Sequence, residues 1–230
     1  MADPALALSY YVVFVFSVTL HEAAHAYVAM RGGDLTAYHG GQVSLSPLPH
    51  MRREPFGMVV LPLLTVAVSG WPFGYASAPY DPRWAEAHPR RAAWMALAGP
   101  VANVLLVGVS ALALRAGLEL GVFHAPASVS FSRIAESDSP LASSGALLLS
   151  VFFSMNLLLA LLNLIPVPPL DGFGALPLLL SPAATRRFRQ LASSGFAVIG
   201  ILLAWRLIDV IFHPIFLLLV NALHTDMHYG

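Results

Sequence analysis

ALALSYYVVFVFSVTLHEAAHAYVAM, residues 5–30, is apolar for most of its length but carries His21, Glu22 and His25 near its end. A helix that crosses a bilayer needs about 20 mostly apolar residues, and this stretch exceeds that length. Charged side chains are costly inside a bilayer, by about 2.5 to 3.5 kcal/mol each on insertion scales, so they mark functional positions there. The stretch therefore predicts a membrane helix that carries a functional polar site.

The composition of the whole chain supports a membrane protein. Of its 230 residues, 57% are hydrophobic and 10% are charged, whereas an ordinary soluble domain has about 25% charged residues. The net charge is zero, which indicates no nucleic-acid partner. The chain has no cysteine, which excludes disulfides and thiolate metal ligands. The start of the chain lacks the basic region and cleavage site of a secretory signal, so we expect the first segment to be retained.

Apolar segments predict the fold class, an all-α integral membrane bundle of four to five membrane segments in a single domain, 1–230. Its core would be 5–172, with an additional C-terminal membrane helix at about 191–221. Four stretches are long enough to span a bilayer: 5–30, 92–115, 146–165 and 191–221. A fifth, 56–74, contains Pro62 and ends in GWPFG, and arginines lie on both of its flanks. Because cytoplasmic loops accumulate positive charge, we expect this segment to re-enter the membrane rather than cross it.

A glycine pair followed by alternating apolar residues predicts a small β-hairpin on the cytoplasmic side, at residues 40–46. We expect Gly41, Val43 and Leu45 to bind substrate there, because an exposed strand edge can take up an extended peptide.

The spacing of His21 and His25 points to a metal site. Residues four apart in a helix lie about 40° apart around the axis and about 6 Å along it, so both imidazoles can hold one cation. Glu22 lies about 100° round from His21, where its carboxylate can exchange a proton with a water activated by the metal. The alternative, in which the three side chains only bond helices together, is weaker because such polar groups in lipid are usually Ser, Thr or Asn.

A catalytic zinc commonly takes three protein ligands and a water. The best third candidate is Asp171, in the stretch NLIPVPPLDG, where prolines end the third membrane segment. Irregular backbone at that depth is tolerated only against protein or a watery cavity, so the turn aims Asp171 inward. A plain Asp-Gly turn remains an alternative. So do other ligands from the cytoplasmic-side loops, namely His39, His50 and His88.

These residues resemble the site-2 proteases, intramembrane zinc metalloproteases, and especially their compact prokaryotic branch without a PDZ domain. The resemblance runs from residue 20 to about residue 172 through HEAAHAYVAMRGGDLTA, SLSPLPHMRREPFG, GYASAPYDPRW, ALAGPVANVLL and NLIPVPPLDGFG. The pairing of HExxH with NxxPxPxLDG is highly specific to that family.

The resemblance implies one zinc ion bound by His21, His25 and Asp171, with Glu22 as the general base. It implies that Asn163 supports the oxyanion or orients the substrate carbonyl, as an amide donor in a dry site can. Three further residues match the family's second core helix and are expected to be structural, with the last of them bonding across to the catalytic helix: Gly99, Pro100 and Asn103.

The resulting function is a zinc-dependent endopeptidase that cuts membrane proteins, most simply single-span ones, in or near their membrane segments. Its partners would be that substrate and the lipid bilayer, and its active site would lie towards the cytoplasmic side of the cell membrane. Two alternatives stay open at this point. One is a divalent-metal transporter, although only one broken helix is seen where transporters usually show paired repeats. The other is a proteolytically silent relative that binds membrane helices.

Overall fold

The computed structural model describes residues 4–181, 183–187, 196–225 and 227–230, and within them it is made of helices and connecting loops. These residues contain no strand, and only two isolated bridges pair backbone segments, His124 with Glu136 and Ser130 with Arg133. The predicted all-α architecture is confirmed.

Within the described residues, four helices are long and apolar enough to span a membrane: α1 (Pro4–Arg31), α6 (Pro89–Glu119), α7 (Pro140–Leu164) and α10 (Phe196–Leu223). Each exceeds the about 20 residues that a crossing needs. They overlap the four predicted spans, although residues 191–195 of the last one lie outside the described residues. Large apolar side chains on α6 are open to the surroundings, among them Leu105 and Leu112. Such side chains suit lipid, so the chain is a multi-pass membrane protein.

Shorter helices occupy the connections: α2 (Thr36–His39), α3 (Pro47–Arg53), the π-helix η1 (Phe56–Val60), α4 (Leu61–Ser69), α5 (Pro82–Ala87), α8 (Asp171–Ala175) and the 3-10 helix η2 (Leu176–Leu178).

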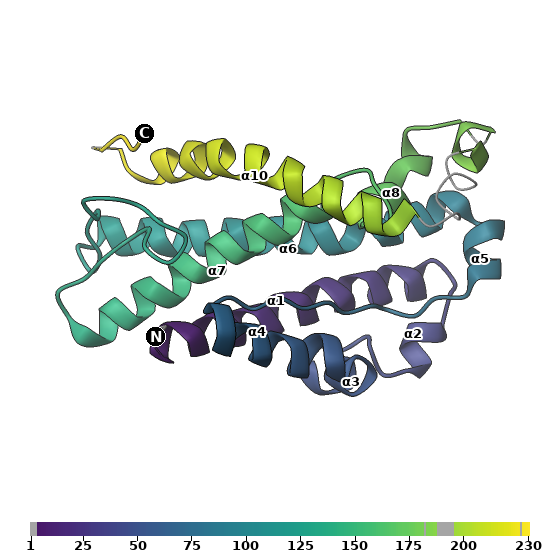
Figure 1. Ribbon diagram of the computed structural model, residues 1–230, viewed down its shortest axis with the longest axis horizontal. Coiled ribbons are helices and arrows are strands. Elements are labelled where there is room, and N and C mark those ends of the chain that lie inside the picture. Colours follow the sequence, from purple (N-terminus) through teal and green to yellow (C-terminus); the bar gives the residue numbers. More distant parts are fainter. Residues whose placement is uncertain (1–3, 182, 188–195, 226) are drawn as a thin grey trace.

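The segment between α3 and α5 runs along α1 and then returns. η1 and α4 pass beside α1 towards its N-terminal half, and the chain then comes back to α5 in extended form (Figure 1). The extended part is held to the outgoing part, because Tyr75 N–H donates to the carbonyl of Gly57 at 3.1 Å and Phe73 N–H donates to Thr65 Oγ1 at 2.8 Å. Both ends of this excursion therefore lie near the C-terminal end of α1.

The predicted β-hairpin at 40–46 is wrong. The N–H groups of Gly41 and Gln42 donate to carbonyls of α2, at Tyr38 and Ala37, and so close the end of that helix. Ser46 accepts from Leu48 N–H and caps the start of α3. The backbone groups that a strand would have needed are thus used by two short helices, and helix capping overrides the weak alternation of Val43 and Leu45.

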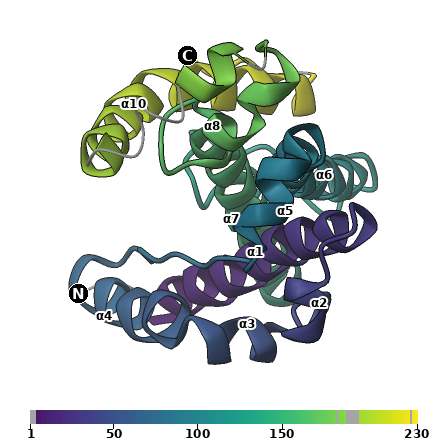
Figure 2. The same cartoon turned by 90° about the vertical axis from the view of Figure 1, so that its right-hand side faces the viewer.

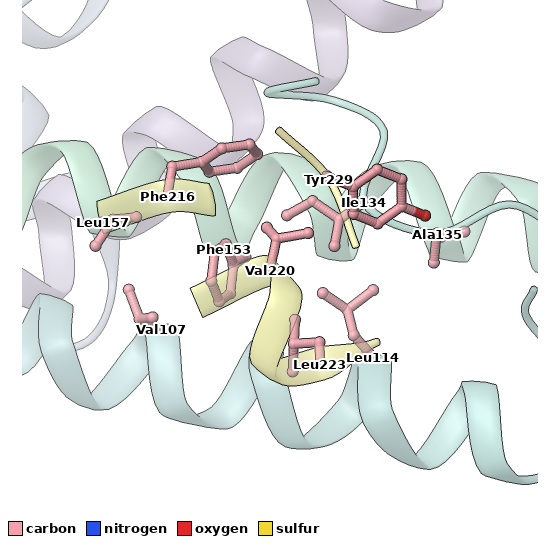
Figure 3. Packing of buried hydrophobic residues seen from close by; sticks show 11 residues of the cluster. Val107, Leu114, Ile134, Ala135, Phe153, Leu157, Phe216, Val220, Leu223 and Tyr229 are labelled. Atoms are coloured by element: carbon pink, nitrogen blue, oxygen red, sulfur yellow. The ribbon is translucent and has the colours of Figure 1, made fainter. Parts of the chain in front are cut away.

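The long helices form layers with α6 and α7 in the middle. Viewed end-on, α10 lies on one side of this pair, and α1 with α4 lies on the other (Figure 2). One apolar cluster joins α6, α7 and α10, with Phe153, Phe216, Val220 and Leu114 at its centre (Figure 3). A second cluster joins α1, η1 and α7 around Phe14, Met58 and Met155. Because lipid is as apolar as these side chains, close packing rather than removal from water holds the helices together.

Candidate metal centre and active site

The two histidines of α1 face the same side of the helix and meet. Their Nε2 atoms lie 3.0 Å apart, and each residue is buried. The regular helix from Pro4 to Arg31 produces this arrangement, since residues four apart stack on one face. His25 is about 9 Å along the axis from Arg31, at the end of the helix.

Asp171 reaches the pair from a different part of the chain. α7 ends at Leu164, three prolines follow, and Asp171 is the first residue of α8, which packs against α6. Its Oδ2 lies 2.9 Å from His21 Nε2 and 3.3 Å from His25 Nε2. The predicted inward turn brings the carboxylate to the imidazoles.

These three side chains fit a zinc ion. Ligand atoms at about 2.0 to 2.1 Å from a tetrahedral zinc lie about 3.3 Å from one another. The three separations here, 2.9, 3.0 and 3.3 Å, are close to that value. Among the described residues, the trio is the one group of three or more His, Cys, Asp or Glu side chains close enough to share an ion. His39, His50 and His88 are not part of it.

Gly99 leaves room for this centre. A Cβ atom on Gly99 would stand 2.5 Å from His21 Nε2 and even closer to His25 Nε2. Any other residue would fill the space beside the two ligand nitrogens. Gly99 was predicted to be structural. Its position beside the two imidazoles shows in addition that the missing side chain leaves space on the α6 side of the centre.

Glu22 and two members of the donor set, His25 and Asp171, face one cavity of about 360 Å³. Glu22 is buried, and its side chain lines the cavity together with His25 and Asp171. The Asp171 side chain is 23% exposed, so the centre can be reached from this cavity. The arrangement suits proton exchange between a carboxylate and a small molecule held beside the donor set.

The cavity has walls that sequence reasoning did not foresee. One wall is the extended segment after α4, through Ala76, Ser77, Ala78 and Tyr80. The other walls come from α5, α6, the α7–α8 connection and α8, through Ala85, Ala92, Met95, Ala96, Pro169, Leu170, Phe173 and Gly174. No periodic signal in GYASAPY indicates this role, because an extended wall has no sequence pattern of its own.

Hydrogen bonds on the far side of each imidazole orient the ring. His25 Nδ1 lies 2.7 Å from the carbonyl of Met95, and His21 Nδ1 lies 2.5 Å from Asn103 Oδ1. A carbonyl only accepts, so His25 carries its proton on Nδ1 and offers the lone pair of Nε2 to the centre. Asn103 thus bonds across to α1 as expected, and its partner is a proposed ligand.

The remaining predicted residues lie away from the cavity. Asn163 Nδ2 donates to the carbonyl of Leu159 in its own helix at 3.0 Å, and Asn163 does not line the cavity. The cavity lining also lacks Gly41, Val43 and Leu45, which lie in the turn between α2 and α3. Their roles stay predictions, and the strand edge on which the last three depended is absent.

One buried asparagine was missed. Asn156 of α7 donates to Ser17 Oγ of α1 at 2.9 Å and accepts from Asn103 at 2.8 Å. The available signal was its amide in an otherwise apolar membrane segment, two helical turns before Asn163.

A His-His-Asp set with two buried imidazoles and a further carboxylate beside it, between helices that can span a bilayer, defines a membrane-embedded metallohydrolase. The sequence profile of Peptidase family M50 matches residues 9–207. Relatives of this chain carry the name "Putative zinc metalloprotease". YwhC of Bacillus subtilis is 32% identical over 193 residues, 83% of this chain and 78% of the relative. Rip2 of Mycolicibacterium smegmatis is 31% identical over 210 residues, 88% of this chain and 71% of the relative.

The chain therefore belongs to peptidase family M50. It is an intramembrane zinc metalloprotease, as the resemblance to site-2 proteases predicted. The Rip2 protein of Mycobacterium tuberculosis H37Rv is 31% identical over 75% of this chain and 58% of the relative. No solved structure matches this chain. A transporter and a proteolytically silent protein are not favoured.

Proposed function

We propose that this protease cuts single-span membrane proteins near the cytoplasmic end of their membrane segment. The observation that carries the proposal is that Glu22 lines one cavity together with His25 and Asp171, which form a donor set with His21. In this proposal residues 1–230 act as one domain, and zinc is held by the two imidazoles and the carboxylate.

Bound zinc supplies a Lewis acid that activates water at neutral pH. Glu22 takes a proton from the attacking water and later returns it to the leaving nitrogen. The Nδ1 bonds of His21 and His25 keep both rings fixed during this exchange. Asn163 can donate to an oxyanion only after its side chain leaves the carbonyl of Leu159, so its proposed role includes that rotation.

The substrate has to be partly unwound, because a helix keeps its carbonyls in hydrogen bonds. We assign the substrate position to the cavity beside the extended segment, in place of the hairpin. Ala76, Ser77 and Ala78, which have small side chains, line the same cavity as His25. An extended peptide can lie against such a segment with its scissile bond at Glu22.

The proposed orientation puts the C-terminal end of α1 in the cytoplasm. The helix ends and short helices at this end carry Arg31, Arg52, Arg53, Arg83, Arg90 and Arg91, and cytoplasmic connections are rich in such residues. In this orientation η1 and α4 re-enter the membrane without crossing it, and the centre lies below the cytoplasmic face.

The orientation is testable because the chain has no cysteine. A single cysteine at exposed Arg83 should react with a membrane-impermeant maleimide in inverted vesicles but not in intact cells, whereas one at exposed Ser128 should show the opposite pattern. Labelling of both from the same side would overturn the four-crossing arrangement.

The activity is tested by co-expressing the protein or its Glu22→Gln variant with a tagged single-span substrate. Gln keeps the size of Glu but cannot take up the proton. We expect cleavage by the wild type alone, with equal zinc content in both proteins. Cleavage by Glu22→Gln would refute the role of Glu22, and metal uptake by cells without cleavage would support transport instead.

A further inference from the structure

A line of buried polar side chains leads away from the metal centre through three helices. It runs from His21 of α1 to Asn103 of α6, then to Asn156 of α7, and back to Ser17 of α1. Three of these residues are fully buried, with an exposed fraction of 0%: Ser17, Asn103 and Asn156. Every bond in the line is therefore shielded from water, and each amide has to be oriented by its protein partners.

The orientation of the Asn156 amide is fixed by a backbone group. Its amide nitrogen lies 2.8 Å from the carbonyl of Phe152, one turn earlier in α7. The oxygen and nitrogen of an amide look alike in shape, but a carbonyl can only accept. Nδ2 of Asn156 must therefore face Phe152, and Oδ1 must face Asn103.

This orientation passes to the next amide. Oδ1 of Asn156 accepts from Nδ2 of Asn103 at 2.8 Å. Asn103 thereby turns its own Oδ1 towards Nδ1 of His21. An amide oxygen only accepts, so the proton of His21 has to be on Nδ1, and the lone pair of Nε2 is directed at Asp171 and His25.

We propose that Asn156 is a positioning residue of the metal centre, which sets the orientation of Asn103 and through it the tautomer of His21. The proposal rests on His21 being a zinc ligand, as in the proposed function. Asn156 touches neither the centre nor the cavity, and it acts through Asn103 alone.

The geometry of α6 explains why one histidine needs this line and the other does not. Met95, Gly99 and Asn103 are four residues apart and share one face of α6, which crosses α1 in the opposite direction. Met95 thus meets His25, Gly99 lies beside both rings, and Asn103 meets His21. The tautomer of His25 is set directly by a backbone carbonyl, which can only accept a hydrogen bond. His21 instead contacts a side-chain amide, which could present either its oxygen or its nitrogen.

The competing explanation is that the line merely bonds α1, α6 and α7 together. The two explanations differ at Ser17. If the line is only an attachment, Ser17→Ala should act like any other break in it. If Asn156 positions the centre, Ser17→Ala should leave zinc binding unchanged, because the carbonyl of Phe152 still orients the Asn156 amide.

The first experiment measures zinc affinity by chelator competition on purified, folded protein, so it does not depend on proteolysis. We expect Asn156→Leu to lower the affinity by about 10 to 100-fold, as loss of an outer partner of a ligand typically does. We expect wild-type affinity for Ser17→Ala. The matched control is Ser150→Ala, which removes a buried bond of α7 to Ile134 N–H away from the centre.

The second experiment reads the tautomer in the metal-free wild type by ¹⁵N NMR of labelled histidine, with His21→Gln to assign the signal. We expect a proton on Nδ1 of His21, whether or not Nε2 beside Asp171 is protonated as well, and a loss of that Nδ1 proton in a fraction of Asn156→Leu molecules. A wild-type His21 without a proton on Nδ1 would overturn the proposal even if Asn156→Leu fails to fold. So would wild-type zinc affinity in folded Asn156→Leu, or an equal loss in Ser17→Ala. If zinc affinity and the His21 proton position are as expected but the wild type cleaves no substrate, only the proposed function is contradicted.

Discussion

Replacing Gly99 with alanine should disable the metal centre with a single methyl group. The added Cβ would stand 2.5 Å from Nε2 and 2.6 Å from Cε1 of His21, and closer still to Nε2 of His25. Non-bonded carbon atoms prefer about 3.5 to 4.0 Å, so the methyl overlaps the ring by about 1 Å. The rings cannot simply turn away, because their Nδ1 atoms are bonded to Asn103 and Met95.

Relief therefore requires a shift of the ligands or of α6 by about 1 Å. A displacement of that size can lower a rate by about 100-fold, and we expect at least such a loss in cleavage together with reduced zinc content. The assay is metal content after purification, zinc affinity by chelator competition, and cleavage of a tagged substrate.

Gly108→Ala is the matched control, because it makes the same change in the same helix at a site with open space around it. Alanine favours helix by about 0.8 to 1.0 kcal/mol over glycine, so the control should be at least as stable as the wild type. If Gly99→Ala bound zinc and cleaved substrate as Gly108→Ala does, the account of the centre as a close fit between α1 and α6 would be refuted.

Three further predictions concern the same machinery. Asp171→Asn should lower zinc affinity by more than the roughly 100-fold that loss of an outer partner costs, measured by chelator competition; affinity equal to wild type would contradict its role as a ligand. Gly57→Ala should reduce cleavage while leaving zinc content unchanged, because its Cβ would overlap the carbonyl of Tyr75 and push the extended wall of the cavity outward; unchanged kcat/KM would show that this wall does not hold substrate. Asp34 is buried, which opposes its charge, but three hydrogen bonds from Thr36 and Asp81 outweigh burial and lower its pKa. Its contribution should therefore be present above about pH 4 and be lost as the pH falls below that value. Asp34→Asn should lower the free energy of unfolding by about 1 to 3 kcal/mol at neutral pH and flatten the pH dependence of Tm; an unchanged pH profile would refute this.

The membrane segments were readable because each is long, apolar and bounded by polar residues. The meeting of His21, His25 and Asp171 was also foreseeable, since a helix fixes the first two and a proline break leaves the third at membrane depth. These inferences rest on local rules that hold whatever the rest of the chain does.

The rest of the site depends on contacts between distant segments. The alternation at Val43 and Leu45 suggested a strand, but helix caps on both sides took up the backbone groups. Asn156 and Ser17 are 139 residues apart, and their bond follows from the packing of α1 against α7. No spacing within the sequence indicates such a pairing, because it depends on which faces of the two helices meet.

In the proposed function, the two-part origin of the donor set governs when this protein can first become active. His21 and Asp171 are 150 residues apart, and Asp171 follows α7. While the chain is being synthesised, the imidazole pair emerges first and has no carboxylate partner until α7 has been made and α8 has docked on α6. On this proposal a chain that ends before α8 cannot cleave its neighbours in the bilayer, because its donor set is still incomplete.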